Sequence, residues 1–422
     1  MNAAKTAPSA MKMAFFYVSS AAAYFAHAIF AYSLIIYAQS RGGGASLSGQ
    51  LLATMYGPML VLGLYGGMLA DRYSRKAILL TSHLLAAAVT AVFACAISKA
   101  LGVGLALFVF AGVYGVPVSV MAATRLAFVG NFAEARALER CTTIVKVLNV
   151  MAFGGGPLVA GWLRERVTWT QLFILPVALW AVSIALLLSL PETRSTVVAR
   201  RASPWSELAE GLRFFQRSSI LRGLGLLSAA VFGLVLGPYQ VLVPLLAKAE
   251  LGLGEASRGL LMGTFGGGLL AGGILSAFVT PYKRRGALMV VAIGGSCAFL
   301  VLAANGSTFR VVAAALAMSG GFGGLLNGLV PTTMQTVTPD AMRARVLSVY
   351  YAILLGTPAF GASVWSWAAG VVGVRLALAV SGVLGVGIAV AAATWLPGVW
   401  RYESGTGADA DSDQELTTGV TP

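Results

Sequence analysis

The residues of this chain that could do chemistry are few, and His27 lies in the middle of a long apolar segment. An imidazole, with an ordinary pKa of about 6.5, changes charge at physiological pH. Tyr24 lies one helical turn away on the same face. The sequence therefore makes His27 a candidate for proton coupling. The alternative is a neutral histidine that only hydrogen-bonds within a helix bundle.

The acidic residues are placed unusually. None of the 15 falls near the middle of an apolar segment. In segments that cross a membrane, carboxylates near the middle mark proton relays and cation sites. The placement of the acids in this chain therefore argues against a carrier specialised for organic cations. It suits a neutral, zwitterionic or anionic cargo. Lys146 and Arg125 could attract an anion, but long side chains near helix ends are expected to snorkel to the membrane surface.

A few polar side chains lie inside apolar segments and could donate hydrogen bonds to a cargo. Each could instead bridge two helices. Together with the histidine they make up the expected substrate cavity: Tyr24, His27, Asn149, Tyr239, Gln240 and Asn327.

Enzyme and metal chemistry are poorly supported by the residue types. The two histidines, His27 and His83, have no acid at their depth, so a nucleophile with a base is not encoded. Cysteines 95, 141 and 297 lie far apart, without metal-site or disulfide spacing. We therefore expect no enzyme, no metal and no cofactor. A channel is a further alternative, but no filter sequence of the kind pores use is evident.

The elements that position these residues follow from composition. The chain is 58% hydrophobic and 10% charged, whereas soluble domains carry about 25% charged residues. Apolar segments of about 20 residues recur, each long enough to cross a bilayer as a helix. We predict an all-α membrane protein with twelve transmembrane helices, at 14–38, 50–70, 77–98, 102–124, 143–163, 169–190, 221–247, 257–280, 286–304, 310–332, 347–370 and 373–396.

One long polar interval divides the twelve segments into two sets of six. Within it, Trp205, Leu208, Leu212 and Phe215 recur at helical spacing, which predicts an amphipathic helix on the membrane surface. Motifs recur at corresponding positions in the two sets, which indicates two pseudo-repeats around a midplane cavity. The predicted organisation is a cytoplasmic N-terminus 1–13, a bundle 14–190, a linker 191–219, a second bundle 220–396, and an acidic disordered tail 397–422.

The basic residues indicate orientation. Most of the 29 Lys and Arg residues fall in the termini, the central interval and alternate loops, which predicts that both termini face the cytoplasm. The net charge of +14 does not indicate nucleic acid, since the bases form short clusters between apolar segments. Membrane lipids and a small-molecule substrate are the expected partners of a monomer in a bacterial inner membrane.

The stretch from Gly67 to Lys76, GMLADRYSRK, resembles the loop signature of the major facilitator superfamily, G-x-x-x-D-R-x-G-R-R. Ser74 replaces the usual glycine. The resemblance implies a gating loop in which Asp71 accepts backbone donors or pairs with a base, and the bases face anionic lipid. The alternative is an ordinary positive-inside loop. The gating loop would consist of Gly67, Asp71, Arg72, Arg75 and Lys76.

Three other stretches resemble one branch of that superfamily, the enterobactin-exporter-like efflux proteins: LPET at 190–193, LAEGLRFF at 208–215 and PDAMRARV at 339–346. The last supplies second-half counterparts of the gating loop, Asp340, Arg343 and Arg345. Gly156, Pro157 and Gly161 partly resemble the antiporter motif of the fifth helix. There, small residues would allow a bend, although close helix packing alone also explains them.

These resemblances imply a secondary active transporter that works by alternating access and proton antiport. The branch exports siderophores and hydrophobic drugs. A siderophore is the expected cargo, with a hydroxamate of the alcaligin type as one candidate and multidrug efflux as the alternative. Import also stays open, because sequence specifies fold better than the direction of flux.

Overall fold

The computed structural model of the chain describes residues 10–98, 104–129, 135–191, 204–279, 282–395, 400 and 402, and over most of 60–72 the backbone alone. Every regular element in these ranges is a helix. Ten of the described segments are long and apolar enough to cross a membrane, and a shorter one spans Leu105–Met121. The expectation of an all-α membrane protein is confirmed.

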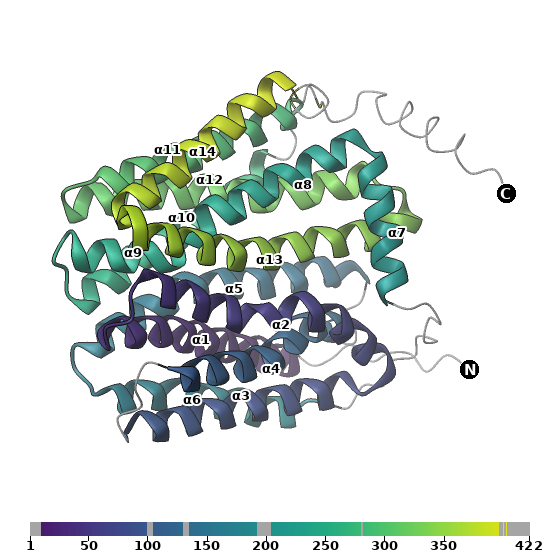
Figure 1. Cartoon of the computed structure of the whole chain (residues 1–422). Helices are drawn as coiled ribbons and strands as arrows, with labels where there is room; N and C mark the ends of the chain where they lie inside the picture. Colours follow the sequence, from purple (N-terminus) through teal and green to yellow (C-terminus); the bar gives the residue numbers. More distant parts are fainter. Residues whose placement is uncertain are drawn as a thin grey trace.

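The first half of the chain forms six helices that pack side by side in the lower layer of Figure 1. A twelve-helix count would also require α2 to cross, and its length of 28 residues allows this. The six helices are α1 (Ala10–Ser40), α2 (Ala45–Arg72), α3 (Arg75–Ser98), α4 (Leu105–Val129), α5 (Ala135–Arg164) and α6 (Trp169–Leu188).

The second half forms the upper layer of Figure 1. Its first crossing is continuous from α8 (Ser219–Val231) through a π-helical turn η1 (Phe232–Leu236) to α9 (Gly237–Ala249). Such turns within α-helices are frequent at functional sites. The remaining helices are α10 (Glu255–Val279), α11 (Arg285–Asn305), α12 (Phe309–Thr336), α13 (Asp340–Val372) and α14 (Val374–Trp395).

Between the halves, α7 (Pro204–Arg217) stands across one end of the bundle (Figure 1). It packs on the start of α13, where a Cβ added at Gly211 would clash with the Arg345 backbone. Arg345 Nη1 donates to Glu210 Oε1 at 2.6 Å. Phe215 is buried and Leu212 is exposed. The amphipathic segment is therefore a helix attached to α13, while the side chains of Trp205 and Leu208 lie outside the described part.

Most of the contact between the halves is made by two helix pairs, α5 with α10 and α2 with α13. In the first pair Gly154 lies against Gly266, and Gly259 against Pro157, with no room for a Cβ. In the second, Gly49 lies against Ala362 with the same closeness. Small residues let helix backbones approach in lipid, where packing drives association. Both seams keep the halves in close backbone contact.

Candidate functional site

Gln39, at the last turn of α1, joins the two halves at one end of the bundle. Its Oε1 accepts a hydrogen bond from Arg258 Nη2 of α10 at 2.8 Å. Its backbone oxygen accepts from Lys248 Nζ of α9 at 3.4 Å. Arg258 is 2% exposed and also donates from Nε to Pro244 O at 3.1 Å. We call Gln39, Lys248 and Arg258 the outer latch, where outer means the end of the bundle opposite α7 (Figure 1).

A second cross-half contact lies at the same end. Glu165, which follows α5, accepts from the backbone N–H of Ala256 in the first turn of α10 at 2.9 Å. A carboxylate at a helix N-terminus is favoured by the free N–H groups and the helix dipole. Glu255 Oε1 meanwhile holds Arg258 Nη1 at 2.5 Å. This end of the bundle is thus closed by polar contacts from both halves.

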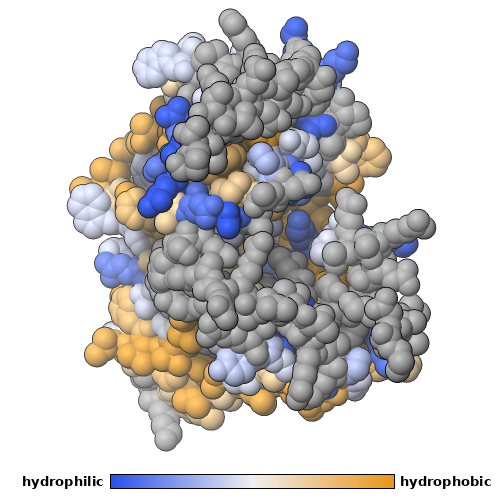
Figure 2. Space-filling view, turned by 90° about the vertical axis from the view of Figure 1, so that its right-hand side faces the viewer, coloured by the Kyte–Doolittle hydropathy of each residue, from blue (hydrophilic) through white to orange (hydrophobic). Residues whose placement is uncertain are grey.

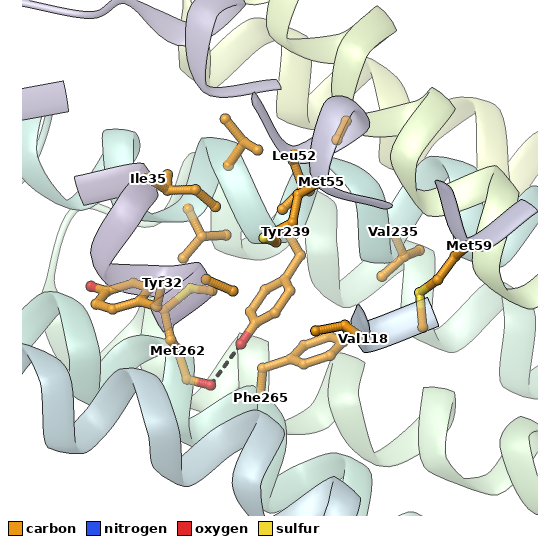
Figure 3. Close-up of a cluster of buried hydrophobic side chains, with 14 of the residues drawn as sticks. Tyr32, Ile35, Leu52, Met55, Met59, Val118, Val235, Tyr239, Met262 and Phe265 are labelled. Carbon is orange, nitrogen blue, oxygen red and sulfur yellow. Dashed lines mark hydrogen bonds between the residues drawn. The ribbon is translucent and has the colours of Figure 1, made fainter. Parts of the chain in front are cut away.

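Beneath the outer latch lies a buried apolar cluster drawn from both halves (Figure 3). Tyr239 of α9 stacks on Phe265 of α10 with ring centroids 4.0 Å apart. Its hydroxyl donates to Met262 O at 2.7 Å. We call the set the central plug; it contains Tyr32, Ile35, Leu52, Met55, Met59, Val118, Val235, Tyr239, Met262 and Phe265. Tyr239 therefore packs inside the plug in this conformation.

Phe153 of α5 meets Tyr239 across the halves, with ring centroids 6.0 Å apart. This contact shows which face of α5 points to the interior. Lys146 is seven residues away, two helical turns along the same face, and it is exposed. Asn149, also exposed, lies nine residues from lipid-facing Leu158, and so about 180° around the helix.

Asn327 of α12 shows the same pattern in the other half. It lies nine residues, about 180°, from Met318, which is 47% exposed on the outer surface. Asn327 is also exposed, although it lies on the inward face. Asn149 and Asn327 are thus both exposed on helix faces opposite the outer surface. Seen end-on from the side of α7, the coloured residues include hydrophilic side chains at several separate places and hydrophobic ones mainly along the flanks (Figure 2).

His27 lies within the first half. Its Nε2 is 3.2 Å from the hydroxyl of Tyr56 on α2, and its ring stacks on Tyr114 of α4 with centroids 5.8 Å apart. Its Nδ1 is buried without a hydrogen-bond partner among the described atoms. Tyr24, one turn earlier in α1, contacts Arg125 instead of His27. The histidine therefore has one hydrogen-bonding position unused.

Arg125 differs from expectation. It does not snorkel: it is 1% exposed and reaches into the first bundle. Its Nη1 donates to Ser20 O at 3.0 Å, its Nη2 is 2.6 Å from His83 Nε2, and its guanidinium lies 4.7 Å from the ring centre of Tyr24. No carboxylate pairs with it among the described side chains. The backbone oxygen of Ser20, the imidazole of His83 and the ring of Tyr24 stabilise the buried guanidinium of Arg125, so this side chain does not extend to the membrane surface.

The remaining predicted site residues lie at helix ends or seams. Lys76 Nζ donates to the oxygens of Leu188, at 2.9 Å, and Leu190, at the end of α6. Arg343 Nε donates to Gln335 O at 3.1 Å, and Gln240 Nε2 donates to Leu236 O at 3.4 Å.

The three residues of the expected helix bend lie in close helix contacts. Gly156 packs on Ala28 of α1; Pro157 and Gly161 pack on α10. Arg75 begins α3 and Asp340 begins α13.

The remaining residues of the gating loop lie at the end of α2. Gly67, Asp71 and Arg72 belong to the last turns of α2, and their side chains lie outside the described part.

The outer latch was not predicted from the sequence. Arg258 follows Glu255 at i+3 in one helix, a spacing at which the two side chains can pair, but this does not predict a partner in the other half. Its partner, Gln39, is far away in sequence and had no local signal.

Comparison with known proteins is consistent across sequence and structure. Residues 49–406 match the sequence model of the transmembrane secretion effector family. Enterobactin exporter EntS of Salmonella choleraesuis is 27% identical over 322 residues, 74% of this chain and 75% of that protein. The uncharacterized major-facilitator-type transporter YfiS of Bacillus subtilis is 24% identical over 258 residues, 60% of this chain and 59% of its own.

Solved structures share the fold. The nucleoside transporter NupG aligns with a TM-score of 0.72 at 13% identity, covering 93% of this chain and 99% of its own. A bacterial homologue of the lysosomal transporter Spinster, in an inward-facing and unoccupied conformation, aligns with a TM-score of 0.66 at 14% identity, covering 98% of each chain. The match over most of the sequence assigns the family: this chain belongs to the transmembrane secretion effectors, transporters of the major facilitator superfamily.

Proposed function

We propose that this transporter exports an anionic siderophore across the bacterial inner membrane, with proton entry as the energy source. The observation that carries the proposal is the charge of the interior. Lys146 lies exposed on the inward face of α5, and Arg125 is buried without a described carboxylate. No helix of either bundle carries an acid in its middle turns. Such an interior attracts anions and repels cations.

The kind of cargo is supported by relatives. Proteins of comparable length named as enterobactin exporters are about 27% identical over three quarters of the chain. Siderophores bind ferric iron through anionic oxygens, which suits a positively charged interior. A carrier of lipophilic cations would be expected to place a carboxylate at this depth. Multidrug efflux of cations is therefore the weaker candidate.

The conformation agrees with loading from the α7 side. The outer latch and the central plug close one end, while Asn149 and Lys146 are exposed towards the other. If the basic loops face the cytoplasm, as the charge distribution predicts, this conformer takes cargo from the cytoplasm. Opening of the latch on the opposite side would then release it, as alternating access requires.

Two finer elements belong to the proposal. His27 is the proposed proton carrier, because no acid lies at midspan and its Nδ1 is free of described partners. The gating loop, with Asp71 and its second-half counterpart Asp340, is the proposed control of the cytoplasmic end. We further propose that the transporter acts as a monomer surrounded by lipid.

The test is a gene deletion in the native host. Siderophore released into iron-poor medium is measured beside sensitivity to a panel of drugs. The proposal expects reduced release with retention inside the cell, restored by the wild-type gene, and unchanged drug sensitivity. Normal release together with sensitivity to cationic drugs would refute it and favour multidrug efflux.

A further inference from the structure

A pocket of about 410 Å³ lies at the outer end of the bundle, where α5 ends and α6 begins (Figure 1). Its lining includes two bases, Arg164 and Arg166, the acid between them, Glu165, and the indole of Trp169. The export function uses none of these bases. The pocket therefore needs an account of its own.

The two bases of the pocket are each held against a tryptophan ring. The Arg164 guanidinium lies 4.2 Å from the ring centre of Trp169, and its Nη1 donates to Val167 O at 2.9 Å. The Arg166 guanidinium lies 4.0 Å from the ring centre of Trp162, and its Nη1 donates to Trp162 O at 2.7 Å. A guanidinium fixed in this way loses little freedom when its remaining N–H groups bind a ligand.

Neither base is paired with an acid among the side chains that the structure describes. Glu165 lies between them in sequence, but its Oε1 accepts from the backbone N–H of Ala256 at 2.9 Å, across the boundary between the halves. The carboxylate is thus bonded to the start of α10 in this conformer. An anion that enters the pocket meets two bases whose charge no described ion pair offsets.

The pocket also adjoins an apolar surface. Trp162 is 50% exposed, and Leu158, one turn earlier on the same face of α5, is 39% exposed. Tryptophan is enriched at the level where lipid hydrocarbon meets the headgroups. Since α5 ends at Arg164 and α6 begins at Trp169, the pocket lies at that level. Phospholipid phosphates lie there too.

From this arrangement we infer that the pocket binds an anionic phospholipid, with its phosphate at Arg164 and Arg166 and an acyl chain along Trp162 and Leu158. Arginine matches phosphate because its planar fork donates two parallel hydrogen bonds. A zwitterionic lipid suits the pocket less well, since its cationic group would lie beside two bases. The inference goes beyond export and holds for any cargo.

The position of Glu165 links the lipid to the conformation of the transporter. Opening of the outer end separates Glu165 from Ala256, and the released carboxylate then competes with the phosphate for Arg164 and Arg166. The lipid accordingly binds more tightly when this end is closed. By linkage, it stabilises the closed conformer by the same factor.

The first experiment measures lipid binding to the full-length protein in a mild detergent by native mass spectrometry. Three probes are compared: phosphatidylglycerol; phosphatidylcholine with the same acyl chains; and glycerol phosphate, which has no acyl chain. The wild type is expected to bind phosphatidylglycerol about tenfold more tightly than phosphatidylcholine, and glycerol phosphate more weakly than either lipid. Arg164→Gln and Arg166→Gln should each weaken phosphatidylglycerol about tenfold, and Trp162→Leu about threefold.

The matched control is Arg310→Gln. Arg310 is an exposed base in the first turn of α12, at the same end of the bundle but outside the pocket. This variant should bind all three probes as the wild type does. Because Arg166 is exposed, Arg166→Gln decides the result even if Arg164→Gln unfolds. Equal losses in Arg310→Gln and Arg166→Gln indicate a general charge effect and overturn the inference. Equal affinities of the wild type for the two lipids also overturn it, and so does glycerol phosphate binding as tightly as phosphatidylglycerol.

The second experiment tests the link to conformation. Spin labels at Gly44→Cys and Ser307→Cys, in loops of the two halves at the outer end, report the separation of the halves in nanodiscs. Adding phosphatidylglycerol to phosphatidylcholine discs should reduce the population with the longer distance. Arg166→Gln should lose this response because it no longer binds the lipid, whereas Glu165→Gln should lose it while still binding the lipid. A distance distribution that ignores phosphatidylglycerol in the parent protein overturns the link.

Discussion

Arg258 of α10 donates a hydrogen bond to the side-chain oxygen of Gln39 of α1 at 2.8 Å, across the boundary between the two halves. Because Arg258 is buried, its charge depends on such acceptors. A guanidinium left without one in a dry site costs free energy. This single contact therefore favours the conformer that is closed at the latch end.

Gln39→Leu is expected to shift the transporter towards the conformer open at the latch. The substitution removes the acceptor of a charged donor, a change of about 1.5–3 kcal/mol, which is roughly ten- to hundredfold in the equilibrium between the two conformers. The measurement is labelling of Met55→Cys, in the central plug, by an impermeant maleimide in a background without Cys95, Cys141 and Cys297.

Labelling of Met55→Cys should become faster from the latch side in Gln39→Leu. The control is Gln50→Leu, since the Gln50 side chain is exposed and, among the described residues, donates to Ser46 Oγ of its own helix rather than across the halves. Equal labelling rates in the two variants would show that the outer latch does not hold this end closed.

Orientation gives a second prediction. Single cysteines at Ser203, in the central linker, and at Gly44, between α1 and α2, should react from opposite sides of the membrane. Gly44 is the suitable site in its loop, because a Cβ there meets open space, whereas one at Gly43 would clash with Leu47 and the Ala38 backbone. Labelling of both cysteines from outside in intact spheroplasts would contradict the twelve-helix arrangement.

The sequence allowed the fold to be predicted more fully than the site. Apolar length identifies membrane helices, since a bilayer imposes one spacing on every crossing. The direction in which each polar side chain points was harder to predict. Lys146 and Arg125 have similar sequence contexts, two bases near helix ends, yet one is exposed on the inward face and the other is buried beside His83. Which way each points depends on the neighbouring helices, and α3 and α1 are distant in sequence from Arg125.

Asp71→Asn is expected to lower transport much more than it lowers the amount of protein in the membrane. Loss of one charge-assisted contact costs about 1.5–3 kcal/mol, and conformers that differ by a few kcal/mol then change their populations by ten- to hundredfold. Siderophore release is compared at equal abundance by immunoblot, with Asp413→Asn in the tail as control. Normal transport by Asp71→Asn would reduce the loop to an orientation signal.

The buried Arg125 predicts a stability effect. His83→Ala removes the imidazole that lies 2.6 Å from Arg125 Nη2 and also the ring that packs on Trp180 at 5.1 Å. We expect a loss of about 1.5–3 kcal/mol, seen as a lower thermal midpoint in detergent. His83→Gln, which keeps an acceptor, should lose less. Equal losses in the two variants would mean that packing, and not the hydrogen bond, sets the effect.

Proton coupling through His27 gives the last prediction. Cargo leaving outward while a proton enters requires a group that both gains and loses a proton within the bundle, and His27 is the titratable side chain at midspan with a nitrogen free of described partners. Uptake into inverted vesicles is measured with and without an imposed pH gradient. The gradient should stimulate uptake in the wild type and in Tyr56→Phe, which removes only the hydroxyl near Nε2, but not in His27→Gln. A His27→Gln variant that responds to the gradient as the wild type does would make His27 structural, and a wild type that ignores the gradient would exclude antiport itself.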